Sequence, residues 1–421
     1  VFDSDAALEQ LTGALTFSLD GFASLTGAFG FEKQTTADAT KLLVGGVDVD
    51  AFLGVDPDAM PDTGDETGAR ISGAQFAALF VKSGDAAPTY ALTASGGGSV
   101  AGVGGLTLTG SLAARVNQTG AAVHETIATA AGDVALDFAN GDHLMSFSGV
   151  ATLRAGDFAE LSGSFAFEKS GEKITIGAAD VDAFVGVGTS SGAPRTGVEV
   201  ANAQFGAVIF TAANQPSVYA LTASGDAAIV GVPDLTLDGT LAIEINQADR
   251  PVDETIATPA GDVHVAFGSA DDVLRVAGRA HFAVAGFVDV AGDFAIAKTT
   301  TTTDSVTTTQ LRAATTNLQA FLGANFEKPG EFGVKLSGAS LGLLVEQTGT
   351  NAAKYALTST GGTAALVGLD GVTLAGALDL DINHLGRSVN ESIPSYGGAT
   401  VPLVFDSDAA LEQLTGALTF S

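Results

Sequence analysis

Apolar and polar residues alternate with a period of two along several stretches of the chain. From Leu106 to Val116 the even positions carry Leu, Leu, Gly, Leu, Ala and Val, whereas the odd positions carry Thr, Thr, Ser, Ala and Arg. The stretches from Leu235 to Ile245 and from Val372 to Ile382 repeat this pattern. Alternation of this kind is typical of a β-strand with one buried and one solvated face. At about 3.3 Å per residue each strand is roughly 36 Å long, about twice the usual length.

The apolar positions of these stretches are expected to face the interior of the protein. The prediction concerns Leu106, Leu108, Leu112 and Val116, together with Leu235, Leu237, Leu241 and Ile245. Phe165 and Phe167 are followed by a Ser-Gly-Glu turn and then by Ile174 and Ile176, which indicates an antiparallel pair of strands. No stretch favours a helix convincingly. The sequence predicts an all-β fold of tandem repeats of long antiparallel strands, arranged as a sandwich, a flattened barrel or a solenoid-like array.

Internal repeats organise the whole chain. Residues 1–18 and 404–421 are identical, 403 positions apart, which indicates tandem units of that length in a longer parent chain. Within 403 residues a diverged repeat recurs: YALT begins at Tyr90, Tyr219 and Tyr355, and the phrases FGFEK, FAFEK and FAIAK recur likewise. The predicted repeats are 8–143, 144–272 and 273–410, and 411–421, identical to 8–18, opens the next unit.

Two features vary or recur in a way that predicts local structure. Length differences between repeats fall in polar stretches such as TTTTTDSVTTTQ after Lys298, which are expected to be surface loops. Glycine recurs near the middle of the apolar faces, at Gly27, Gly110, Gly163, Gly239, Gly292 and Gly376. These glycines predict a line where long strands bend, or where phenylalanine rings lie against bare backbone.

Composition excludes several functional classes. The 421 residues include 18 basic and 48 acidic ones, and a net charge of −30 repels nucleic acid. The absence of cysteine excludes disulfides, thiolate zinc sites and cysteine nucleophiles. No apolar run approaches the roughly 20 residues of a membrane helix, so no membrane span is expected in this segment.

Acidic residues clustered in turns are candidate calcium ligands. Carboxylates from adjacent loops can supply the oxygens that calcium requires, although Asp is also an ordinary turn residue. The candidate metal ligands are Asp3, Asp5, Asp142, Asp271, Asp272, Asp406 and Asp408. Calcium is the one cofactor that these residues suggest.

Two further sets of polar residues recur between the repeats. The motif DVDAF places Asp48 with Asp50 and Asp180 with Asp182, but the third repeat carries Asn317 and Gln319, which argues against a catalytic carboxylate pair. Asn and Glu recur eight positions apart around a variable loop and are predicted to brace it through backbone hydrogen bonds, with metal ligation as the alternative. These pairs are Asn117 with Glu125, Asn246 with Glu254, and Asn383 with Glu391.

The composition and phrases such as SGSFAFEK and DETIAT resemble those of giant repetitive cell-surface proteins of Gram-negative bacteria, the long adhesins and extracellular filament proteins. The resemblance implies a non-catalytic, extracellular structural segment of a filament or stalk, whose partners are other copies of its own repeat. The alternative is a repetitive adhesin or surface coat that contacts glycans or neighbouring cells.

Overall fold

The computed structural model describes residues 7–19, 23–55, 67–101, 106–156, 158–188, 195–212, 215–303, 306–369 and 374–420. Nearly all of these residues form β-strands, and the single helical element among them is a short 3-10 turn at Tyr396–Gly398. Hydrogen bonds assign twenty strands to one antiparallel sheet and six more to three two-stranded hairpins. The prediction of an all-β array of long antiparallel strands is confirmed.

The strands follow one another in three similar series and the beginning of a fourth. The first series is β1 (Ala7–Leu19), β2 (Ala23–Thr35), β3 (Thr40–Val55), β4 (Thr67–Lys82), β5 (Thr89–Ala101), β6 (Leu106–Asn117), β7 (Val123–Thr129) and β8 (Gly132–Phe138). The second is β9 (Leu144–Ala155), β10 (Ala159–Ser170), β11 (Lys173–Val187), β12 (Thr196–Phe210), β13 (Val218–Val230), β14 (Leu235–Gln247), β15 (Val252–Thr258) and β16 (Gly261–Phe267). The third is β17 (Asp272–Val284), β18 (Val288–Thr303), β19 (Val306–Ala324), β20 (Phe332–Thr348), β21 (Lys354–Thr360), β22 (Thr363–Val367), β23 (Leu374–Asn383), β24 (Val389–Pro394) and β25 (Thr400–Phe405), after which β26 (Leu411–Phe420) begins the fourth.

The chain also divides into two compact units that do not coincide with these series. Unit 1 comprises Val1–Ala183, Val208–Ser217 and Thr255–Val263, and unit 2 comprises Phe184–Ala207, Val218–Glu254 and His264–Ser421. Strands β11 and β12 therefore contribute residues to both units. The repeat boundaries 8–143, 144–272 and 273–410 stay a prediction.

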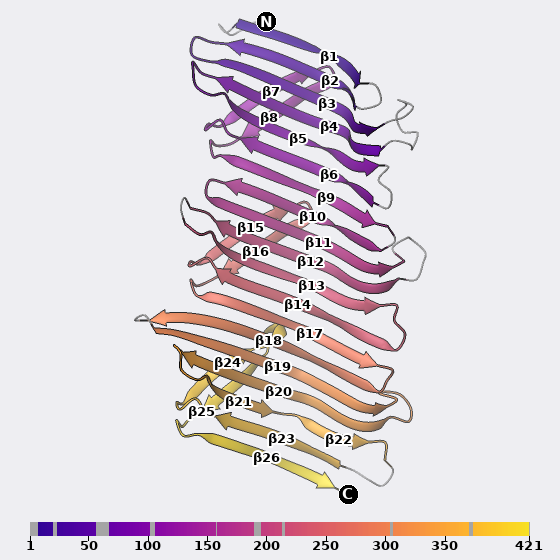
Figure 1. Ribbon diagram of the computed structural model, residues 1–421, viewed down its shortest axis with the longest axis vertical. Helices are drawn as coiled ribbons and strands as arrows, with labels where there is room; N and C mark the ends of the chain where they lie inside the picture. The colour runs from indigo at the N-terminus through magenta and orange to yellow at the C-terminus, as the bar shows by residue number, and fades with distance from the viewer. Residues whose placement is uncertain are drawn as a thin grey trace. The chain divides into compact units, whose positions relative to one another are not determined.

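The core of unit 1 lies between one face of the long strands and the hairpin β7–β8, which packs on that face (Figure 1). Leu43, Ala77, Leu79 and Ala91 of the long strands are buried against Val123, Ile127, Val134, Leu136 and Phe138 of the hairpin. We call this side of the long strands the hairpin face. In unit 2 the hairpin β24–β25 forms a corresponding core with Ala314, Leu344 and Ala356.

The opposite side of the long strands carries the strictly alternating apolar residues. Register places Leu92, Val116 and Met145 side by side on this face, and Leu108 opposite Leu153. The predicted alternation is therefore present, but the expectation that these residues face the interior is wrong for five of the eight, which are between 36% and 43% exposed: Leu106, Leu108, Leu112, Leu237 and Leu241. The reason is that each hairpin covers the other face, where Gly, Ala and Leu replace polar residues over part of the strand length.

β-Bulges lie close to two of the recurring glycines, Gly27 and Gly292, whereas the strands that carry Gly110 and Gly239 pair in continuous register. In β3, Asp48 has a φ of 49° and the register with β2 shifts by one residue between Thr26 and Ala28. A Cβ on Gly27 would lie 2.9 Å from the Val49 side chain, so Gly27 leaves space for the residue that follows the bulge. At Gly27 the bare backbone thus accommodates a bulge, with a valine side chain rather than a phenylalanine ring over it.

One expected surface loop is paired structure instead. After Lys298, Thr300–Thr303 of β18 pair in register with residues 306–309 of β19. β-branched threonine favours extended backbone, so this insertion lengthens two strands rather than forming an irregular loop.

Candidate functional site

Each hairpin sits on the sheet where glycine leaves room for it. In unit 1 a Cβ on Gly30 would overlap the carbonyl oxygen of Ala128, and one on Gly45 would lie 2.9 Å from Cγ2 of Ile127. In unit 2 a Cβ on Gly342 would lie 3.0 Å from Cγ1 of Val401. These approaches are closer than ordinary van der Waals contact, so the hairpin can dock closely because these positions have no side chain.

A fully buried asparagine fastens the two ends of the hairpin segment to the last long strand before it. In unit 1, Nδ2 of Asn117 donates to the carbonyl oxygens of Ala121 and Asn140, at 2.9 and 3.0 Å. Its Oδ1 accepts a hydrogen bond from the backbone N–H of Thr119 at 3.0 Å. The carbonyl of Ala121 precedes the hairpin and that of Asn140 follows it, so one side chain fixes both the entry and the exit of the hairpin.

The same arrangement recurs in unit 2. Asn246 donates to the carbonyls of Arg250 and Ser269, and Asn383 donates to those of Arg387 and Ser407. Both asparagines are about 1% exposed. We call the three together the asparagine clasps; the recurrence of these residues was visible in the sequence, but their second acceptor, 23 or 24 residues downstream, was not.

The candidate calcium ligands lie in the same turns that the asparagine clasps hold. Asp142, Asp271, Asp272, Asp406 and Asp408 are exposed and follow the hairpins, and the carbonyl oxygen of Asp271 accepts a hydrogen bond from Asn246 at 3.4 Å. Asp3 and Asp5 lie outside the described residues. In the part of the chain that the structure describes, no three His, Asp or Glu side chains are grouped so that they could hold a metal ion. Calcium binding stays a prediction.

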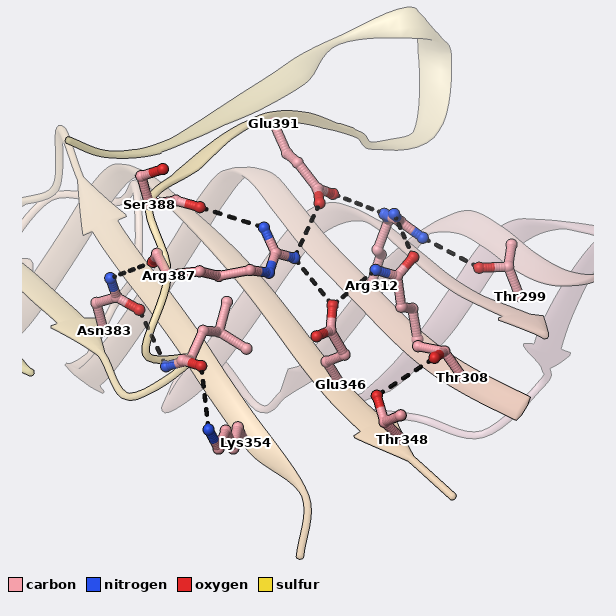
Figure 2. A network of polar contacts seen from close by, with 12 residues as sticks. Thr299, Thr308, Arg312, Glu346, Thr348, Lys354, Asn383, Arg387, Ser388 and Glu391 are labelled. Atoms are coloured by element: carbon pink, nitrogen blue, oxygen red, sulfur yellow. Dashed lines mark hydrogen bonds and ion pairs between the residues drawn. The ribbon is translucent and has the colours of Figure 1, made fainter. Parts of the chain in front are cut away.

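Two of the glutamates that recur with the clasps, Glu125 and Glu391, form ion pairs with the long strands. Glu125 lies 2.6 Å from Nζ of Lys41 in β3. Glu391 lies 2.8 Å from Nε of Arg312 in β19 and 3.8 Å from Arg387, a residue of the loop before its hairpin (Figure 2). These glutamates therefore connect the hairpins to the sheet, and of the contacts described for Glu125 and Glu391 only the one with Arg387 reaches the loop.

Figure 2 shows that the ion pair of Glu391 with Arg312 in unit 2 belongs to a larger polar network on the hairpin face. Glu346 of β20 accepts hydrogen bonds from Gln310 and Arg387, both at 2.9 Å. Burial raises the pKa of the Glu346 carboxyl, but the hydrogen bonds from Gln310 and Arg387 outweigh it and hold that pKa below its ordinary value. The network joins β19, β20 and the hairpin segment through charge-assisted hydrogen bonds.

A second polar cluster in unit 2 surrounds His281 of β17 and includes residues of β14 and β18. Nδ1 of His281 lies 3.1 Å from Asp238 and Nε2 lies 3.0 Å from Asp289. The hydrogen bond with Asp289, supported by that with Asp238, raises the pKa of the His281 imidazole. The ring borders a shallow hollow of about 410 Å³ that also includes Glu199 and Asp226.

The first aspartate of each DVDAF motif, and its counterpart in the third series, has a structural role in the backbone. Asp48, Asp180 and Asn317 all have left-handed backbone, with φ of 49°, 49° and 54°, a conformation that Asp and Asn tolerate best among residues with side chains. The carboxylate of Asp50 accepts a hydrogen bond from the backbone N–H of Gly73 at 2.9 Å. The replacement of Asp48 by Asn317 in the third series therefore preserves the backbone requirement.

The face opposite the hairpin in unit 1, which we call the apolar face, carries many exposed apolar side chains. Many of its large side chains on β1–β6, β9 and β10 are between 36% and 68% exposed. They are Leu11, Leu15, Phe17, Phe31, Leu42, Leu53, Val55, Ile71, Phe80, Tyr90, Leu106, Leu108, Leu112, Met145, Phe147, Leu153 and Leu161.

Charged residues occupy only one margin of the apolar face. Among its register-paired positions in these strands they are Glu9, Lys33, Lys82 and Lys169. Glu9 and Lys33 form an ion pair at 3.2 Å.

No protein-family model matches this chain, and no curated protein matches it either. In the described part of the chain no helix has the length and apolar character needed to cross a membrane.

Proposed function

We propose that this chain is a non-catalytic structural segment of an extracellular filament or stalk, in which β repeats associate edge to edge with further copies of themselves. The observation that carries the proposal is the register of the strands that begin each series. Gly13, Gly149 and Gly278 lie opposite Phe29, Phe165 and Phe294, respectively, in the strand that follows.

The last long strand of each series pairs with the first strand of the next series, and the register of this pairing is also the same each time. Leu112, Leu241 and Leu378 lie opposite Gly149, Gly278 and Gly416. Residues 8–17 and 411–420 have the same sequence and form β1 and β26, so the same strand pairs with β2 at one place and with β23 at the other. The internal equivalents β9 and β17 pair with both neighbours. The pairing thus supports a sheet that continues from one 403-residue unit to the next, with each unit covering the sheet edge of its neighbour.

A tandem protein with two 403-residue units in series tests the proposal. Because the junction strand gains a second partner, the urea midpoint of the tandem protein should exceed that of the single chain, and electron micrographs should show one continuous particle. The control is the same tandem protein with Thr415→Pro, since proline in the junction strand removes a ladder hydrogen bond. Two independent unfolding transitions at the single-chain midpoint would contradict the proposal.

A further inference from the structure

We propose that the apolar face of unit 1 docks against the same face of a second copy of this chain. This contact is separate from the edge pairing described above, because it uses side chains on the sheet surface rather than backbone groups at a strand edge.

The area of the apolar face is that of a stable protein interface. An aromatic side chain has about 150 to 250 Å² of surface and an aliphatic one less, so the residues of the apolar face, exposed by 36–68%, together leave on the order of 1,000 Å² uncovered. The largest apolar patch of a typical monomer is about 300 to 600 Å². A standard interface buries about 800 Å² on each partner, which the apolar face exceeds.

The relief of the apolar face allows it to complement itself. Gly98, Gly110, Ala151 and Gly163 lie side by side across β5, β6, β9 and β10, forming a row with almost no side chain. The next row carries leucines at 108, 153 and 161, again in register. In a twofold pairing, the leucine row of each copy can lie over the small-residue row of the other, as an isologous interface requires.

The charge distribution favours a second copy over other flat partners. The charged residues of the apolar face lie at one margin, so a docked sheet need not desolvate an unpaired charge at its centre. With a net charge of −30 the chain is repelled by anionic lipid surfaces. A second copy carries the same net charge, but the paired positions at the centre of its apolar face are uncharged. A second copy presents the same strand twist and the same uncharged centre, as two sheets packed face to face require.

Sedimentation velocity over a range of protein concentrations tests the proposal. The whole chain should sediment as a dimer or larger species, and Leu108→Asp should weaken association at least tenfold because the carboxylate enters the leucine row. Thr109→Asp is the matched control: it adds the same charge to the same strand on the opposite, exposed side and should leave association unchanged. Circular dichroism shows whether both variants keep their strand content.

Spin labels identify the face in contact. The chain contains no cysteine, so Leu112→Cys and Ser111→Cys each provide a single attachment site. Sheets packed face to face lie about 10 Å apart, so labels at 112 should show strong dipolar coupling between copies and labels at 111 weaker coupling. A chain that stays monomeric, equal effects of the two Asp variants, or a monomer that binds neutral phosphatidylcholine vesicles through this face would each overturn the proposal. The variant Thr415→Pro, which disrupts edge pairing, should leave the face-to-face association intact. Failure of the docking proposal can therefore be told apart from failure of the filament proposal.

Discussion

Gly30→Ala is expected to loosen the hairpin β7–β8 from unit 1. The added methyl group overlaps the carbonyl oxygen of Ala128, so the hairpin must move away by about 1 Å, a gap that forfeits a quarter to a half of the dispersion energy at the contact. The hairpin contributes five buried side chains to the core, each stabilising by about 1.5 to 3 kcal/mol, or roughly 10 kcal/mol together. The expected loss is therefore about 2 to 5 kcal/mol, in line with overpacked cores.

Amide hydrogen exchange measures this loss where it occurs. The free energy of opening derived from the amides of Val123–Thr129 should fall by that amount, and the urea midpoint should fall with it. Gly13→Ala is the matched control, because a Cβ there meets nothing within 4 Å and the change should stay within about 0.5 kcal/mol or stabilise slightly. Equal protection of the hairpin amides in the two variants would refute the view that the hairpin depends on the missing side chain of Gly30.

Two further substitutions test the polar contacts. Asn117→Ala should destabilise unit 1 by about 1 to 3 kcal/mol, because the carbonyl groups at both ends of the hairpin lose a fully buried donor; urea unfolding measures this against the exposed control Ser111→Ala. The raised pKa of His281 means that its ion pairs stabilise the folded state fully below the ordinary histidine pKa and lose that contribution as pH rises through the folded-state pKa. An NMR titration should give an imidazole pKa above that of a histidine peptide, and His281→Gln should flatten the pH dependence of the urea midpoint; an unshifted titration contradicts the assignment.

The strands and their two faces follow from the sequence because side-chain period and strand geometry are coupled locally. Leu108 and Thr109 point to opposite sides wherever the strand pairs, so alternation alone assigns them. The face that receives the hairpin could not be predicted in the same way. It depends on contacts between residues far apart in the chain, such as Gly30 with Ala128, and a glycine in a strand is by itself compatible with a bend, a bulge or a close approach.

The asparagine clasps and their ion pairs could be predicted from the sequence only in part, because they too depend on contacts between distant residues. The recurrence of Asn117 and its equivalents indicated a loop-closing role, since such side chains hydrogen-bond nearby backbone. The acceptor at Asn140 lies beyond the whole hairpin, and the partner of Glu125 is Lys41 in a different strand, so neither could be derived from local spacing. Turn preferences of aspartate and ligation of calcium also predict the same residue type, which left Asp142 open to both interpretations.

The paired threonines of β18 and β19 show how this architecture can accept new sequence. Lys298 lies opposite Leu311, as Lys33 lies opposite Leu42 in β2 and β3, although twelve residues separate the first pair and eight separate the second. An insertion that adds equal numbers of residues to both arms of such a turn leaves every pairing behind it in place. The ends of strands that are joined by such a turn can therefore differ in length and sequence between repeats. They are suitable positions for grafting an epitope or an enzyme tag without disturbing the hairpin cores.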